Sequence, residues 1–194
     1  WKFIDALLRN EPIVVYGENE EIANFNACVE MARDPGRRYG VVITEQSDEA
    51  TPYIGYLTNR GLSFQDILDC GMYYVSKTYS FVYKENKRVG NIGHRVIWPI
   101  YGGSNKLVSW LARSIDPNLP KRSLKYINAP GTELSKTVWP FVPPLIKDIV
   151  IVEGIIDALA VRKAGYYSYA TFGKKLSEEQ ISLFKYWNVE SITV

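Results

Sequence analysis

Hydrophobic and polar positions change their spacing several times along the first 70 residues, and each change predicts a new element. Over residues 1–44 the pattern predicts two amphipathic helices and two short strands. The helices are expected over 1–9 and 20–33, and the strands over 13–16 and 39–44. A helix over 50–59 follows. Ser63 then opens another helix, because Asp66 three residues later completes a capping box that satisfies two backbone amides.

The middle of the chain is rich in β-branched and aromatic residues, which predicts an antiparallel meander. Its strands are expected over 73–84, 89–101 and 106–113, with polar turns between them. Pro99 cannot donate a hydrogen bond to a neighbouring strand, so its strand is expected at a sheet edge or at a bulge. The basic residues between 116 and 131 are expected in exposed loops, because turn-forming residues flank them.

From residue 148 onward, strands and helices alternate. The apolar run 149–152 predicts a strand that is covered on both faces. The next helix is expected to end at Lys163, with Gly165 as its cap. A second strand over 168–172 and a third that begins at Ser191 complete a set of three parallel strands.

The last predicted helix opens with a second capping box, formed by Ser177 and Gln180. The apolar spacing predicts that its buried face consists of Ile181, Phe184 and Trp187. The chain is therefore expected to be an α/β protein in two parts. A mixed α+β basic subdomain covers 1–147, and the first β-α-β-α-β part of a parallel sheet covers 148–194.

Composition limits the classes of protein that this pattern allows. Hydrophobic residues make up 46% of the 194 and charged residues 23%, which excludes a disordered tail and a collagen-like repeat. Apolar runs are too short for a membrane-spanning helix. Cys28 and Cys70 are too few for a zinc site or a disulfide framework, and are expected to be buried thiols of a reducing compartment. The start at Trp1, without a methionine, indicates a piece of a longer protein.

Charge is distributed unevenly around a small net value of +2. Residues 84–147 contain 11 basic and 3 acidic side chains, whereas residues 11–69 contain 4 basic and 11 acidic ones. A basic block interleaved with aromatic rings favours single-stranded nucleic acid, because cations neutralise the backbone while bases stack on the rings. The alternatives are a solvated basic face and rings that belong to the core. The rings are those of Trp98, Tyr101, Trp110, Tyr126 and Trp139.

Two acidic residues stand where the first parallel strand meets its helix. Glu153 follows the strand, at the carboxyl edge where open α/β sheets place their sites. Asp157 comes four residues later, which on a helix puts both carboxylates on one face. Such a pair suits Mg²⁺, which binds one or two carboxylates together with waters and substrate phosphates. The alternative is that both residues only complement the helix dipole.

The motifs from this point onward resemble the opening of a Toprim domain, in the form found in DnaG-type primases. These enzymes polymerise RNA primers in bacteria and many phages. The matching segments are VEGIIDAL (152–159), ATFG (170–173) and LSEEQ (176–180). Upstream, YIGYLTNRGLS (53–63) resembles the family's "YL..RGLS" helix pair, HRVIWPI (94–100) its "RVxFPI" strand, and KYINAP (125–130) its "KYLNSP" segment. The resemblance covers 52–194, whereas residues 1–50 match no motif, which indicates a divergent, phage-type member.

This resemblance implies metal-dependent synthesis of short RNA primers from nucleoside triphosphates on single-stranded DNA. It assigns Glu153 the catalytic role, as a ligand of Mg²⁺ (or Mn²⁺) or as the base that activates the primer 3′-hydroxyl, with Asp157 as a second metal ligand. The family completes this site with an Asp-x-Asp pair after the third strand, which here would lie beyond Val194. The chain as given is therefore expected to be inactive or nearly so.

The resemblance also implies contacts to nucleotides and nucleic acid. Phosphates would be bound by Arg95, Arg113, Lys125 and Lys136, although the sequence is one residue shorter than the family before Lys136. Tyr126 and Asn128 would contact the RNA–DNA heteroduplex, the alternative for Tyr126 being a ring packed under its loop. A replicative helicase would bind through regions outside this sequence, and the setting would be the cytoplasm of a bacterial cell or an infected host.

Two other functions are kept as hypotheses. One is a different Toprim enzyme, such as a nuclease or topoisomerase. The other is a non-catalytic module that binds single-stranded nucleic acid. His94 is the single histidine, and without a cluster of other ligands beside it a structural role is expected.

Overall fold

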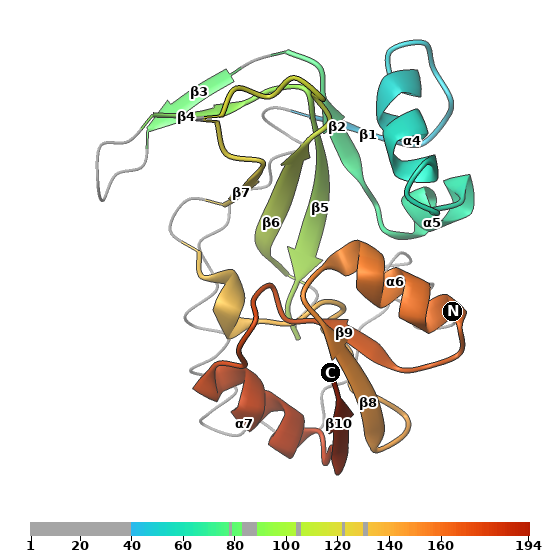
Figure 1. Cartoon of the computed structure of the whole chain (residues 1–194), viewed down its shortest axis with the longest axis vertical. Coiled ribbons are helices and arrows are strands. Elements are labelled where there is room, and N and C mark those ends of the chain that lie inside the picture. The colour runs from blue at the N-terminus through green and yellow to red at the C-terminus, as the bar shows by residue number, and fades with distance from the viewer. Residues whose placement is uncertain (1–39, 78, 83–88, 104–105, 122, 130–131) are drawn as a thin grey trace. The chain divides into compact units, whose positions relative to one another are not determined.

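The computed structural model describes residues 40–77, 79–82, 89–103, 106–121, 123–129 and 132–194 (Figure 1). The elements expected over 1–33 lie outside these residues. The described chain forms two compact units. The first contains 40–99 and 109–132, and the second contains 100–108 and 133–194.

An antiparallel sheet forms the centre of the first unit, as the β-branched and aromatic residues of this part of the chain predict. Its order is β1-β2-β5-β6-β7, and β3 and β4 form a separate two-stranded hairpin. The strands are β1 (Val41–Val42), β2 (Tyr73–Val75), β3 (Tyr79–Val82), β4 (Val89–Ile92), β5 (Arg95–Tyr101), β6 (Leu107–Ser114) and β7 (Tyr126–Asn128). Buried side chains from these strands form one apolar cluster that includes Ile97, Trp110 and Ile127.

Pro99 departs from its prediction, because β5 lies inside the sheet between β2 and β6. The pairing of β2 with β5 covers Arg95–Ile97. Pro99 lies beyond that stretch, so its missing N–H falls where the short strand β2 has already ended. An internal strand therefore accommodates a proline at a position that is locally an edge.

The first unit also contains two helices that contact each other, α4 (Thr51–Thr58) and α5 (Phe64–Asp69). The predicted capping box at the start of α5 is confirmed, since the Asp66 amide donates to Ser63 Oγ at 3.2 Å and the Ser63 amide donates back to the Asp66 carboxylate. On α4, the Tyr53 ring stacks on Tyr74 of β2 with centroids 4.9 Å apart. The Tyr53 hydroxyl also donates to the carbonyl of Val75 at 3.2 Å. These contacts fix α4 to the sheet.

The second unit contains the predicted β-α-β-α-β order, and its three strands are parallel in the order β10-β8-β9. Figure 1 shows the two helices on opposite sides of this sheet. Gly165, just after the first helix, has φ +93°, a conformation that glycine adopts without strain. The elements are β8 (Asp148–Val152), α6 (Ile155–Lys163), β9 (Ser168–Ala170), α7 (Glu178–Tyr186) and β10 (Ser191–Thr193).

The buried face of α7 differs from its prediction at one position. Phe184 and Trp187 are buried as expected, but the Ile181 side chain is exposed. Gln180 is buried in its place, because its amide nitrogen donates to the carbonyls of Thr137 at 2.6 Å and Thr171 at 2.9 Å. The same residue completes the predicted capping box with Ser177, so a polar side chain occupies a core position with its hydrogen bonds satisfied.

The segment before β8 packs with this second unit. It contains a short 3₁₀ turn, η1 (Leu134–Lys136). Trp139 exchanges two backbone hydrogen bonds with Ala170 of β9, at 3.0 and 2.8 Å. The Tyr169 hydroxyl donates to the carbonyl of Val142 at 2.8 Å, and burial raises the pKa of this hydroxyl, so it stays protonated. Among the described helices, none is long and apolar enough to cross a membrane.

Candidate nucleic-acid interface and metal site

Arg95 fixes the backbone of the loop between β6 and β7, residues 115–125, which we call the basic loop. Its guanidinium is buried and donates to the carbonyl of Leu124 at 2.7 Å and to that of Lys125 at 3.1 Å. The Ser114 amide donates to the same Lys125 carbonyl at 3.0 Å. Arg95 therefore holds the loop backbone, and its binding to phosphate stays a prediction.

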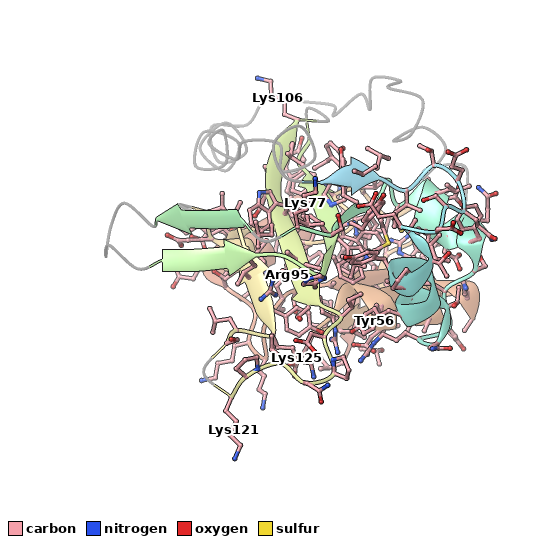
Figure 2. The ribbon with its side chains drawn as sticks, turned by 90° about the horizontal axis from the view of Figure 1, so that it is seen from above. Tyr56, Lys77, Arg95, Lys106, Lys121 and Lys125 are labelled. Carbon is pink, nitrogen blue, oxygen red and sulfur yellow. The ribbon has the colours of Figure 1, made fainter. Side chains whose placement is uncertain are left out.

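Lys121, Leu124 and Lys125 of the basic loop are exposed to solvent. Figure 2 shows Lys121 extending from the loop at the bottom of the view, with Lys125 above it and Arg95 further toward the centre of the picture. Both lysines are exposed, and the Leu124 side chain between them is 64% exposed. The loop thus presents two cations and an apolar group to solvent, an arrangement suited to a polyanion that also offers flat apolar faces.

Arg113 lies against two tyrosine rings. Its guanidinium carbon is 4.7 Å from the centroid of Tyr126 and 5.6 Å from that of Tyr56. Only 6% of Arg113 is exposed, whereas Tyr126 is 44% exposed. Among the aromatic residues of the basic block, Trp98, Trp110 and Trp139 are buried in the core, so the predicted interleaving of rings and cations holds at Tyr126 alone of these four.

The Asn128 side chain is directed toward its own turn. Its amide nitrogen donates to the carbonyl of Thr132 at 2.8 Å and lies 3.4 Å from that of Ala129. The Thr132 hydroxyl is 2.7 Å from that of Ser109, which ties the turn to β6. These bonds give Asn128 a structural role at the end of β7.

Glu153 occupies the carboxyl end of β8, as its position in the sequence predicts. The Phe172 amide, just after β9, donates to the Glu153 carbonyl at 3.1 Å, so the ends of the two strands are joined at this edge. The Glu153 side chain is exposed. One expectation is wrong: Glu153 precedes the N-cap Gly154 and is not on the helix, so helical spacing does not align it with Asp157.

Asp157 lies in the first turn of α6 and its carboxylate folds back over Gly154. A Cβ added to Gly154 would lie 2.9 Å from Asp157 Oδ2, so only a glycine leaves room for this carboxylate position. Both Asp157 and Glu153 offer exposed carboxylate oxygens, the ligand type that Mg²⁺ prefers. The described residues contain no group of three or more His, Cys, Asp or Glu able to hold a metal ion. The donors fit Mg²⁺ held by one or two carboxylates and completed by other oxygens.

Lys136 forms ion pairs within the second unit. Its ammonium lies 3.1 Å from a carboxylate oxygen of Glu133 and 3.7 Å from one of Glu179. The pKa of Glu179 is lowered, mainly by its own backbone amide at the start of α7, with Ser177 and Lys136 adding to the effect. The Lys136 ammonium thus forms ion pairs with two carboxylates.

Sequence reasoning gave no role to Tyr56 and Arg60, which lie within the YIGYLTNRGLS segment. The Arg60 guanidinium carbon is 4.9 Å from the centroid of the Tyr56 ring, on the ring that also contacts Arg113. A signal was present, because an aromatic and a cation four residues apart at a helix end can contact each other. His94 is exposed and has φ 49° in the turn between β4 and β5.

Comparison with known proteins identifies relatives among DNA primases. No protein-family model matches the chain. The DNA primase of Halalkalibacterium halodurans is 31% identical over 119 residues, which is 57% of this chain and 19% of that protein. The DNA primase of Thermotoga maritima is 29% identical over 192 residues, 84% of this chain and 33% of that protein. The chain therefore spans a third or less of these two relatives.

Solved structures with the same fold are also primase domains. A DnaG primase catalytic domain bound to single-stranded DNA matches 85% of this chain and 58% of its own, with a TM-score of 0.59 and 18% identity. The RNA polymerase domain of Mycobacterium tuberculosis DnaG, in complex with a DNA duplex that has a 6-nucleotide overhang, matches 89% of this chain and 60% of its own, with a TM-score of 0.61 and 20% identity. By sequence the chain is a relative of DNA primases, and it shares the fold of part of the DnaG primase catalytic core.

Proposed function

We propose that this chain is the part of a primase that binds single-stranded DNA and begins the metal site for RNA primer synthesis. The observation that carries the proposal is the basic loop, whose backbone is fixed by Arg95 while Lys121 and Lys125 are exposed (Figure 2). The next residue after Lys125 is Tyr126, whose ring is also exposed. Cations next to an exposed ring are the combination that binds single strands. The reaction, synthesis of RNA primers, is proposed because the relatives are named DNA primases.

On the second unit, Glu153 and Asp157 would hold Mg²⁺ or Mn²⁺. Such an ion, when bound, supplies positive charge to phosphate oxygens during nucleotidyl transfer. Glu153 either ligates the ion or accepts the proton of the primer 3′-hydroxyl, and its exposed carboxylate at the end of β8 allows either role. Lys136 would bind phosphate by exchanging its carboxylate partners for the nucleotide.

The remaining partners follow from this role. Nucleoside triphosphates are the substrates, and an RNA–DNA heteroduplex is the product that leaves across Tyr126. In this proposal the basic part of the chain, residues 1–147, handles nucleic acid, and residues 148–194 begin the Toprim part. A replicative helicase would bind elsewhere in a longer protein, and the reaction would take place in the cytoplasm of a bacterial cell or an infected host.

Binding of single-stranded DNA tests the proposal directly. The 194-residue chain is titrated onto a fluorescein-labelled oligo(dT) strand at several salt concentrations, and the affinity is measured by fluorescence anisotropy. The double variant Lys121→Ala/Lys125→Ala is expected to lower the salt slope of log K by about 1.4, since each lost phosphate contact to a single strand removes roughly 0.7.

The matched control is Lys163→Ala/Lys185→Ala, which removes the same charge from α6 and α7. Its salt slope should remain within error of the parent chain. A parent chain that does not bind oligo(dT), or a control variant that loses as much slope as the loop variant, would contradict the proposal.

Gly154 offers a second test of the metal site. Gly154→Ala is expected to weaken Mn²⁺ and Mg²⁺ binding severalfold, measured by isothermal titration calorimetry, because the new Cβ displaces the Asp157 carboxylate. The φ of −121° at Gly154 suits alanine, so α6 should form normally. Gly173→Ala is the control, because a Cβ there meets no described atom within 4 Å. Equal metal affinity in the two variants would remove Asp157 from the site.

A further inference from the structure

Four side chains of the first unit form an alternating series of cations and rings. From α4 outward the order is Arg60, Tyr56, Arg113 and Tyr126, with cation-to-centroid distances of 4.9, 5.6 and 4.7 Å. We call this series the cation–ring column. It connects the end of α4 to β6 and β7, which are far from α4 in the sequence.

Burial changes along the column. Arg113, in the interior, is almost fully buried, and the two rings that it contacts take the place of lost hydration. Tyr56 is half-buried, and its hydroxyl is buried with no hydrogen-bond partner among the described residues. Tyr126, at the outer end, is 44% exposed. The column thus supports an aromatic ring that remains open to solvent.

The open ring directly follows Lys125 in the sequence. Arg95 fixes the backbone of Lys125, and the Lys125 side chain is exposed (Figure 2). A strand whose phosphate lies at Lys125 would therefore have a base within reach of the Tyr126 ring. Stacking of a base on a ring tolerates any sequence, and a ring already held in place loses little freedom on binding.

We propose that Tyr56 is a positioning residue for nucleic-acid binding: through Arg113 it holds the Tyr126 ring so that one base of a single strand stacks on it. This inference rests on the proposed function and assigns Arg113 to the column instead of to a phosphate. The hydroxyl of Tyr56 has no part in it, because only the ring face contacts Arg113 and Arg60.

The test uses the 194-residue chain and an oligo(dT) strand that contains one 2-aminopurine, a base whose fluorescence is quenched by stacking. Tyr126→Ala is expected to abolish the quenching on binding and to weaken binding by roughly 5- to 150-fold, with an unchanged salt slope. Tyr56→Leu should reduce the quenching and weaken binding in the same direction, again without a change in slope. Tyr56→Phe, the matched control, should behave like the parent chain.

A double variant separates positioning from general support of the fold. If Tyr56 acts through Tyr126, then Tyr56→Leu should have no further effect on affinity in the Tyr126→Ala background. Circular dichroism checks that each variant is folded, and Tyr56→Met replaces Tyr56→Leu if the latter does not fold. Tyr126 is exposed, so Tyr126→Ala is expected to fold. The stacking test can therefore be made whichever Tyr56 variant is used.

The outcomes separate this inference from the proposed function. A parent chain that does not bind the strand overturns both. Binding in which Tyr126→Ala keeps the quenching, or in which Tyr56→Leu matches the parent, overturns the positioning role alone. Tyr56→Phe weakening binding as much as Tyr56→Leu would assign the effect to the hydroxyl and overturn the column as its cause.

Discussion

Replacing Glu153 by glutamine is expected to lower primer synthesis by roughly 10²- to 10⁴-fold, the range that loss of a positioned acid–base group produces. Glutamine keeps the shape of the side chain but lacks the charge that holds a divalent cation and the basicity that accepts a proton. Glu153 is exposed at the end of β8, so the substitution should leave the fold and the affinity for single-stranded DNA unchanged.

The assay uses a longer protein that contains this sequence, because the chain spans a third or less of the two DNA primases compared with it. Short RNA products are measured with single-stranded DNA, nucleoside triphosphates and Mg²⁺ or Mn²⁺. Glu178→Gln is the control, since Glu178 is also an exposed glutamate near a helix start in the second unit. Synthesis at the parent rate by the Glu153 variant would remove Glu153 from the mechanism.

The largest expected effect on stability comes from Phe184. Its ring is 2% exposed and packs edge-on against Tyr169, with centroids 5.6 Å apart, and against Trp187 at 6.1 Å. Phe184→Ala leaves a cavity in this cluster and is expected to lower the free energy of unfolding by about 3–5 kcal/mol. Urea unfolding followed by circular dichroism measures the change.

Ile181 is the matched control on the same helix. It is 40% exposed, so Ile181→Ala should change the free energy of unfolding by no more than about 0.5 kcal/mol. Sequence spacing alone predicts that both positions are buried and hence similar losses. Comparable losses at Ile181 and Phe184 would therefore contradict the observed orientation of α7.

Local patterns account for the elements that the sequence predicts well. The two capping boxes involve residues three apart, and the strands of the second unit are short apolar runs bounded by turn residues. Neither depends on distant parts of the chain. The local pattern does not predict the burial of Gln180, because that burial depends on residues in other parts of the chain. The carbonyls that satisfy it belong to Thr137 and Thr171, and the Thr137 carbonyl lies 43 residues away in the sequence.

The candidate binding residues show the same limit. The resemblance to primases assigns Arg95 and Arg113 to phosphates but indicates none of their contacts within the fold, where both are buried, one against loop carbonyls and one against tyrosine rings. Their partners lie in other elements, so no spacing in the sequence indicates them. The position of Glu153 can be predicted from the sequence, because it follows the end of an apolar strand and depends on no contact with another element.

The pairing of Trp139 with Ala170 has a consequence for how the parallel sheet can grow. The two backbone hydrogen bonds between Trp139 and Ala170 block the outer side of β9 at that point, so a new strand cannot lie alongside it there. The opposite margin of this sheet is β10. Any further strand of this sheet must therefore pair with Ser191–Thr193, so the sheet can be extended only on the β10 side.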